Sequence, residues 1–412
     1  MKTFLFVLAC AVAFSVQAQL PRTSPRSAGF DPARLEVLHA TTKQFVGEGK
    51  HAGIITLIAR DGKIVDFQAY GLRDVEKQLP MERDTICRAY SMSKIITCAA
   101  ALMLLEDGKY NLDDPVAKYL PELKNMKVWT DGTQDEPKTE ALKRPITIKH
   151  LLTHTSGLIY DFMGNDELTK TWRAAELWSG PGLTNFTAKL GKLPLKHQPG
   201  DAFTYGVNQD VLGALIERVS GQRFGAFLEE RMFRPLGMKD TGFDVPTNKM
   251  NRLAKTYKVV DGKFVEDKPI IDTWPEEGRG IEAGGAGIFS TAGDFARFAQ
   301  MLCNGGTLDG KRILGRKTIE LMTADHMVTL TNNPTASPRQ KGFGLGVEVT
   351  TDLGRLSMPS SIGQFGWYGA ATTYCQIDPK ERIVAIAMVQ HFPFNQHNFF
   401  AAFQTGYYQA LK

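Results

Sequence analysis

A serine and a lysine stand three positions apart at the start of the apolar segment "AYSMSKIITCAAALMLLEDG", residues 89–108. In a helix, residues i and i+3 share one face, so Ser91 and Lys94 would lie about one turn apart. The free N–H groups and the dipole at a helix N-terminus favour developing negative charge. An amine desolvated by the apolar residues that follow can take a proton from a serine. The spacing therefore indicates a nucleophile for acyl transfer.

The same two residues allow a structural interpretation, in which Ser91 caps the helix and Lys94 extends to solvent. Ser93 is a weaker candidate nucleophile because Ile96 follows it at i+3. Other catalytic patterns are missing from the sequence, since it contains neither a G-x-S-x-G turn nor a glycine-rich phosphate loop. His150 and His154 have the spacing of a zinc pair, but the glutamate of H-E-x-x-H is missing. No metal and no cofactor are expected.

Strand-forming segments lie near both ends of the chain. Two of them flank Asp61-Gly62 and two flank Asp261-Gly262, a dipeptide typical of two-residue hairpin turns. A third pair, "ATTYCQI" and "RIVAIAMVQ", is joined by "DPKE". Before the first hairpin, Asp31 and Pro32 predict the N-cap and first position of a helix.

The middle of the chain is mostly helical in its patterns. We therefore predict an α/β fold in which one antiparallel sheet, flanked by helices, is assembled from both ends of the chain and a helical domain is inserted. The expected divisions are residues 19–90 and 241–412 for the sheet domain and residues 91–240 for the helical domain.

Residues 1–18 have the pattern of a secretory signal peptide: Lys2, an apolar run, and small residues ending at Ala18. The run is too short for a membrane span, so stable membrane insertion is not expected. A lipoprotein signal that uses Cys10 is an alternative. The pattern predicts an exported protein, periplasmic or secreted, that is cut near Ala18.

The composition of the 412 residues is ordinary for a globular protein, with 43% hydrophobic and 23% charged residues. The net charge of +5 is spread along the chain, so no nucleic-acid partner is expected. Four cysteines follow the signal peptide, and each lies in or beside an apolar run, which favours buried free thiols over the three pairings they allow: Cys87, Cys98, Cys303 and Cys375. Nothing in the sequence indicates an oligomeric state.

The blocks "RAYSMSKIITCAAALMLLEDGKYNLDDPVAKYLPEL" and "ITIKHLLTHTSGL" resemble the serine β-lactamase and penicillin-binding protein superfamily. The chain looks closest to the class C β-lactamase-like group, which includes esterases and D-amino-acid peptidases. The resemblance extends to "GWYGAATTY" near the C-terminus. It implies a β-lactamase-like sandwich and a serine hydrolase that works through an acyl-enzyme.

The resemblance also implies site residues. Ser91 and Lys94 correspond to the nucleophile and its lysine, and Tyr205 to the tyrosine of the second motif. Val207 stands where that motif has asparagine, as in many esterase-like members, and Asn208 is interpreted as the N-cap of the next helix. Which of Lys94 and Tyr205 deprotonates the serine stays open, because the two can titrate as a coupled pair.

The third motif, K/H-T-G, is replaced by a W-G-G-like variant made of Trp367, Tyr368 and Gly369. These three residues would contact substrate. The N–H of Ala370 would form the oxyanion hole together with the N–H of Ser91. The alternative is that the two aromatic residues only pack within a strand.

The sequence thus predicts an exported serine hydrolase acting on a small-molecule ester, amide or β-lactam, with a carboxylesterase favoured. One alternative is a β-lactamase or a D-amino-acid peptidase or transpeptidase acting on cell-wall peptides. A second is a sensor that is acylated without turnover.

Overall fold

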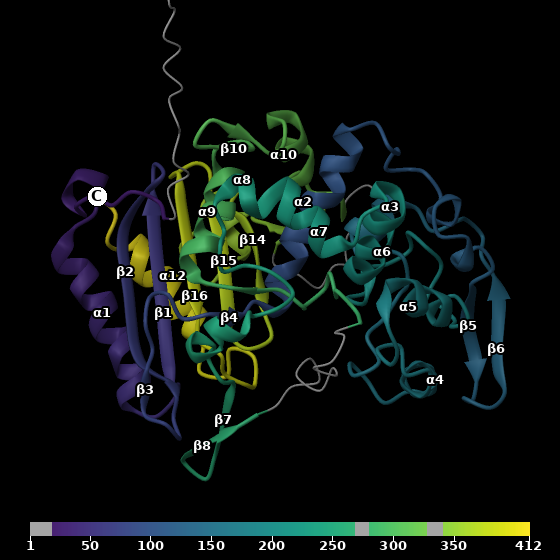
Figure 1. Ribbon diagram of the computed structural model, residues 1–412, viewed down its shortest axis with the longest axis horizontal. Helices are drawn as coiled ribbons and strands as arrows, with labels where there is room; N and C mark the ends of the chain where they lie inside the picture. The colour runs from purple at the N-terminus through teal and green to yellow at the C-terminus, as the bar shows by residue number, and fades with distance from the viewer. Residues whose placement is uncertain (1–18, 268–279, 328–340) are drawn as a thin grey trace, which may run out of the picture.

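The computed structural model describes residues 19–267, 280–327 and 341–412. The predicted signal peptide therefore lies outside the described residues. An antiparallel sheet of eight strands is assembled from both ends of the chain, as predicted, because the first strand pairs with the last (Figure 1). In spatial order the strands are β12 (Gly342–Phe343), β13 (Glu348–Val349), β14 (Phe365–Gly369), β15 (Thr373–Asp378), β16 (Ile383–Met388), β1 (Gly53–Arg60), β2 (Lys63–Asp74) and β3 (Leu79–Pro80).

Both predicted Asp-Gly hairpins are confirmed. Asp61 and Gly62 join β1 to β2 with φ values of 54° and 75°. Asp261 and Gly262 have φ values of 49° and 74° and join β7 (Tyr257–Val260) to β8 (Lys263–Glu266). Positive φ at both central residues is the geometry of a type I′ turn, whose twist matches that of the strands it joins. The second hairpin projects below the sheet (Figure 1).

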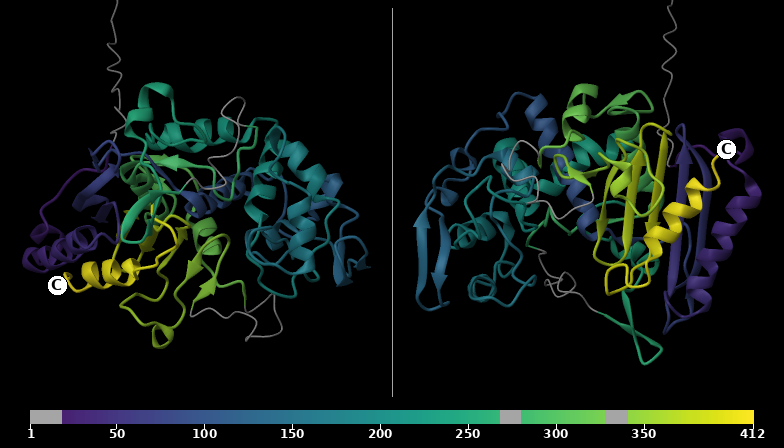
Figure 2. Two further views of the ribbon diagram at one scale, coloured as in Figure 1. Left: turned by 90° about the horizontal axis from the view of Figure 1, so that it is seen from below. Right: turned by 180° about the vertical axis from the view of Figure 1, so that it is seen from behind.

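Helices cover both faces of the sheet. On one face lie α1 (Pro32–Gly47) and α12 (Phe399–Tyr408), which pack on each other, and on the other face α9 (Ala292–Cys303) packs on β16 (Figure 2). Because both faces are covered, every residue of β16 is buried. The start of α1 is as predicted, with the Asp31 carboxylate accepting the N–H of Ala33.

Most of the other helices lie beside the sheet, in the part of the chain between β4 (Cys87–Arg88) and β9 (Phe289–Ser290) (Figure 1). They are α2 (Ser93–Glu106), α3 (Ile148–Leu152), α4 (Glu167–Ala174), α5 (Gly182–Leu190), α6 (Asn208–Ser220), α7 (Phe224–Leu228) and α8 (Arg234–Leu236), with α10 (Arg316–Met322) following β9. The region also contains a hairpin that the sequence analysis did not predict, β5 (Lys127–Gly132) with β6 (Pro137–Ala141).

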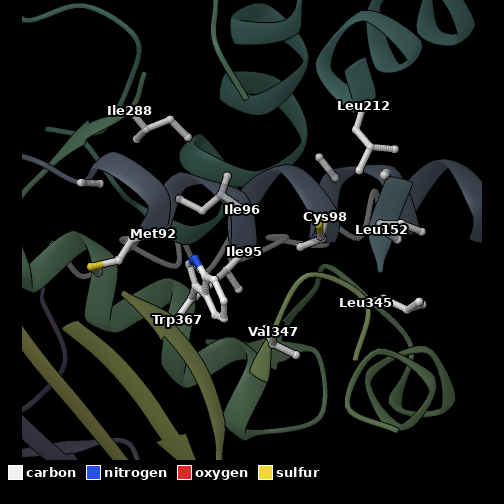
Figure 3. Close-up of a cluster of buried hydrophobic side chains, with 14 of the residues drawn as sticks. Met92, Ile95, Ile96, Cys98, Leu152, Leu212, Ile288, Leu345, Val347 and Trp367 are labelled. Atoms are coloured by element: carbon white, nitrogen blue, oxygen red, sulfur yellow. The ribbon is translucent and has the colours of Figure 1, made fainter. Parts of the chain in front are cut away.

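The helix α2 forms the centre of the largest hydrophobic core. It is buried on all sides from Ser93 to Leu104, as expected of a helix that is apolar all round. Figure 3 shows Ile95 and Cys98 of α2 between Val347 from the sheet side and Leu212 from the helices. Although α2 is apolar all round, neither it nor any other helix in the described ranges is both long enough and apolar enough to cross a membrane.

The four cysteines among the described residues are free, and three of them are buried. Burial raises the pKa of the thiols of Cys87, Cys98 and Cys303 to about 12 and also raises that of Cys375.

Three histidines meet at the end of the sheet where β16 leads into the C-terminal segment. The ring of His51 is fully buried and lies 4.7 Å from the ring of His391 and 5.3 Å from that of His397. Neither nitrogen of His51 has a hydrogen-bond partner among the described residues. Burial, followed by the neighbouring His391 and His397 and the Lys50 ammonium, lowers the pKa of His51 to about 3. The ring is therefore neutral in the folded protein at neutral pH.

We expect this cluster to make the fold sensitive to acid. The unfolded chain takes up a proton at His51 near the ordinary pKa of 6.5, whereas the folded chain does so only near 3. Stability is then fully present above the ordinary pKa and is lost as the pH falls toward 3. Between about pH 7 and about pH 5, the loss of unfolding free energy from His51 alone is about 2 kcal/mol. Urea unfolding across pH should show that His51→Phe removes this part of the pH dependence.

His39 provides a control of opposite sign. Its hydrogen bond to Asp66 raises its pKa, so its protonated form stabilises the fold at low pH and that contribution is lost as the pH rises. In His39→Gln the unfolding free energy should therefore fall more steeply with decreasing pH than in the wild type. If the unfolding free energy of His51→Phe falls with decreasing pH as steeply as that of the wild type, His51 is not the source of the acid sensitivity.

Candidate active site

Ser91 lies at the junction of the sheet and the helices. The sequence analysis placed it at the head of an α-helix, and this was wrong in detail. Ser91 lies in a 3-10 turn (Tyr90–Met92), and α2 begins two residues later at Ser93. Tyr90 has a φ of 47°, a left-handed conformation that is strained for a residue with a side chain and typical of functional sites.

Lys94 is buried directly behind Ser91. Its side chain is 1% exposed, and its ammonium donates to the Ser91 Oγ at 3.1 Å and to the Gly285 carbonyl at 2.7 Å. The Lys94 Nζ also lies 4.7 Å from the centre of the Tyr205 ring and 5.2 Å from that of Tyr160. An ammonium over ring faces is attracted by their negative quadrupole, more so when water is excluded. The predicted contact between Ser91 and Lys94 is therefore present.

The segment that receives Lys94 is fixed by the strand pair formed by β4 and β9. Two further side chains of α2 hold the same segment: Thr97 donates to the Gly284 carbonyl at 2.7 Å, and the Ser93 Oγ accepts the N–H of Ile288 at 3.2 Å. Ser93 is also fully buried, so its role is structural.

Tyr205 comes from the loop that precedes α6. Its ring packs on the buried His154 ring at 4.8 Å. The interpretation of Asn208 as an N-cap was wrong, because Asn208 is the first residue of α6 and caps nothing. It is buried, accepts a hydrogen bond from Ser156 and bonds to the His154 Nδ1 at 2.8 Å. Its role is to hold the ring that supports Tyr205.

The two histidines with zinc-like spacing have separate functions in the fold. His150 closes a capping box at the start of α3, where its Nδ1 accepts the N–H of Thr147. Within the described ranges, no group of three or more histidine, cysteine, aspartate or glutamate side chains is arranged to hold a metal ion.

The third-motif residues lie on β14. The indole N–H of Trp367 donates to the Tyr205 hydroxyl at 3.4 Å. Gly369 passes so close to the turn before Ser91 that an added Cβ would lie 2.4 Å from the Ala89 carbonyl oxygen. This approach brings Ala370, the residue after β14, to the wall of the cavity that Ser91 also lines.

Two site residues were not predicted from the sequence: Tyr160 and Asp210. Asp210 on α6 is 1% exposed and accepts the N–H of Gly285 at 2.8 Å, so it holds the same peptide segment that receives Lys94. Burial raises the pKa of Asp210 to about 6, although the Lys94 ammonium favours its charged form. Burial and the Asp210 charge raise the pKa of Tyr160 well above its ordinary value, so that Tyr160 stays protonated. The only sequence signal was a carboxylate within the apolar helix "NQDVLGALI".

A cavity of about 1000 Å³ opens above these groups. Its wall combines the Ser91 side chain with many aromatic side chains from both the helices and the sheet. All the residues that the sequence analysis placed at the site line it except Lys94, which lies beneath: Ser91, Tyr205, Trp367, Tyr368, Gly369 and Ala370. A serine backed by a buried lysine and a tyrosine, at the floor of an apolar cavity, has the parts needed for acyl transfer.

The β-lactamase family model matches residues 38–406. The chain belongs to the β-lactamase family. The resemblance seen in the sequence is thereby confirmed, and the protein is a serine hydrolase with a β-lactamase-like fold.

Three comparisons describe where the chain lies within this family. Protein Rv1367c of Mycobacterium tuberculosis is 34% identical over 361 residues, which cover 86% of this chain and 89% of the relative. Esterase EstB of Burkholderia gladioli is 32% identical over 294 residues, covering 66% and 71%. The solved structure of EstCE1, described as a hydrolase with promiscuous acyltransferase activity, superimposes with a TM-score of 0.77 at 26% identity, covering 91% and 99%.

We expect Asp210 to be a positioning residue that acts through Lys94. Asp210→Asn removes the negative charge near Lys94 but keeps the shape and an acceptor for the Gly285 N–H. Losing the charge weakens both interactions, at a cost of up to about 1.5–3 kcal/mol, or roughly 10- to 100-fold in kcat/KM. In the wild type, kcat/KM should fall as the pH drops through about 6, where Asp210 takes up a proton. The kcat/KM of the variant should show no such fall, and at higher pH it should stay below the wild-type value.

Asp294 is a matched control. Burial raises its pKa to about 6 as well, but it lies on α9, where it accepts the N–H of Asp240. Asp294→Asn should lower stability and leave the pH profile of kcat/KM in place. A folded Asp210→Asn enzyme with the wild-type rate and the same acid step would refute the role of Asp210.

Proposed function

We propose that the protein is an exported serine carboxylesterase that works through an acyl-enzyme on Ser91. The observation that carries this proposal is the contact of the Ser91 hydroxyl with the buried Lys94 ammonium at the floor of a large apolar cavity. Export rests on the signal-peptide pattern of residues 1–18.

For this reaction one member of the pair formed by Lys94 and Tyr205 must be deprotonated, as the free amine or as the phenolate. The Ser91 Oγ attacks the ester carbonyl carbon, and its proton passes to that member of the pair. The pair returns the proton to the leaving alcohol as the acyl–oxygen bond breaks. Water then attacks the acyl-enzyme, gives a proton to the same pair and releases the acid while Ser91 regains its proton. The N–H groups of Ser91 and Ala370 are assigned to the oxyanion of both tetrahedral intermediates.

The walls of the cavity favour an ester over a charged β-lactam. In the class C β-lactamases that the chain resembles, a lysine of the third motif holds the carboxylate of the drug. Here that place is taken by Trp367, whose indole N–H is directed to Tyr205. The ammonium of Lys341 also lines the cavity, but the Glu348 carboxylate neutralises it at 2.7 Å. Of the described residues that line the cavity, none then offers an uncompensated cation to a drug carboxylate, and burying that carboxylate unpaired is costly.

Acyl transfer to an alcohol is the second candidate function. The cavity has room for an acyl group and an apolar acceptor together, and EstCE1, whose fold the chain shares, is a hydrolase with promiscuous acyltransferase activity. Adding a primary alcohol to an ester hydrolysis assay discriminates the two, because a transferase forms the new ester at the expense of the free acid.

The nucleophile is tested by Ser91→Ala. The variant should fold normally and lose about 10³-fold or more in kcat, as nucleophile deletions do. A fluorophosphonate should add once to the wild type and not to the variant, as measured by intact-protein mass spectrometry. Ser93→Ala is the control and should still be labelled. Equal labelling of Ser91→Ala and wild type would exclude Ser91, and one equivalent of product without turnover would indicate an acylated sensor.

The substrate class is tested by comparing p-nitrophenyl butyrate with nitrocefin at one pH. Loss of a charge-assisted hydrogen bond to the drug carboxylate costs about 1.5–3 kcal/mol, so the ester should be favoured by at least about tenfold in kcat/KM. A D-Ala-D-Ala peptide in the same panel tests the peptidase alternative. If nitrocefin is the better substrate by about tenfold, the protein is a β-lactamase with an unusual third motif.

A further inference from the structure

A charged pair lies in the wall of the otherwise apolar cavity. The ammonium of Lys341 and the carboxylate of Glu348 are in contact at 2.7 Å, and each side chain is only 11% exposed. Both residues line the cavity that contains Ser91. Burying a charged pair away from water is costly unless its remaining hydrogen-bonding capacity is used. A pair in such a place therefore suggests a function beyond packing.

The sheet fixes the geometry of this pair. Glu348 on β13 lies opposite Gly366 on β14, which in turn lies opposite Gln376 on β15. Gly366 has no side chain, so Gln376 reaches across it and donates to the Glu348 Oε1 at 3.2 Å. Tyr368 lies two residues beyond Gly366 on the same face of β14 and donates to the same oxygen at 2.5 Å.

All three donors, including Lys341, converge on one carboxylate oxygen, the Oε1 of Glu348. Among the described residues, none donates to the Oε2 of Glu348. This oxygen is also absent from the set of side-chain atoms that are fully buried without a partner. The Lys341 ammonium has three N–H donors and uses one of them on Glu348. The rigid pair thus leaves one acceptor and further donors for a group that enters the cavity.

We propose that Lys341, Glu348 and Tyr368 form a specificity site for a neutral hydrogen-bonding group of the substrate, a hydroxyl or an amide. This inference rests on the proposed esterase function of Ser91. A hydroxyl can accept from Lys341 and donate to the Glu348 carboxylate, whereas a second carboxylate would be repelled by Glu348 and an ammonium by Lys341. The preferred substrate is then an ester whose apolar body carries one neutral polar group remote from the scissile bond.

The test uses p-nitrophenyl esters of linear acids of about six to twelve carbons that end in a methyl, a hydroxyl or a carboxylate group. At the chain length that spans the cavity, the wild type should favour the hydroxyl end over the methyl end by about tenfold in kcat/KM, the equivalent of one good hydrogen bond. The carboxylate end should be the poorest. A parallel series of butyrate esters of diols and of simple alcohols tests the same preference on the alcohol portion.

Charge-altering variants separate recognition from packing. Lys341→Met should bring the ratio of hydroxyl to methyl substrates close to one. Glu348→Gln leaves the Lys341 ammonium without its counter-charge, so the carboxylate-ended ester should improve by about tenfold relative to the methyl-ended one. A gain for one substrate is not expected of a merely structural role. Lys118→Met, which removes an exposed ion pair with Asp114, is the control and should leave every ratio unchanged.

The outcomes distinguish this inference from the function on which it rests. Hydrolysis that depends on Ser91 but shows no hydroxyl preference in either series overturns the specificity site and leaves the esterase intact. Full activity in Ser91→Ala overturns the proposed function, an esterase that works through an acyl-enzyme on Ser91. A Glu348→Gln enzyme that unfolds at the wild-type urea concentration but gains nothing on the carboxylate series also overturns the specificity site.

Discussion

The burial of the Lys94 ammonium is the constraint on which the rest of the structure depends. A charge removed from water needs compensation from fixed groups, and here these are the Gly285 carbonyl, the Asp210 carboxylate and the faces of two tyrosine rings. The groups come from segments far apart in the chain, so the helices and the strand pair of β4 and β9 must both be in place before the cation is satisfied. Fold and site are therefore parts of one arrangement.

The features of the fold that could be predicted are those with local signals. Asp-Gly turns place φ > 0 at two adjacent residues and so mark the hairpins, and the Asp31 cap marks the start of α1. The hairpin of β5 and β6 has no such signal, because nearly all of its side chains are polar or exposed and no alternating apolar pattern results. The two-residue strands β12 and β13 are too short to produce a pattern.

The site shows the same division. The spacing of Ser91 and Lys94 is local, so their contact was predictable, whereas the left-handed Tyr90 that offsets Ser91 from α2 was not. Asp210 lies in a helix that sequence patterning describes as core, and its function emerges only when Gly285 is brought beside it from another part of the chain. Asn208 was predicted to cap the backbone of its own helix, but its hydrogen-bond partners are the side chains of Ser156 and His154 in another loop.

The four thiols have a consequence for how the folded protein responds to oxidants and reductants. The thiolate is the form that oxidants and disulfides attack, and burial keeps these thiols protonated. The Cys98 sulfur is also packed closely against Gly346, since a Cβ added there would lie 2.2 Å from the sulfur, and an oxygen added to the sulfur on that side would clash in the same way. The folded protein therefore has no disulfide among its described residues for a reductant to open, and its three buried cysteines are shielded from oxidants.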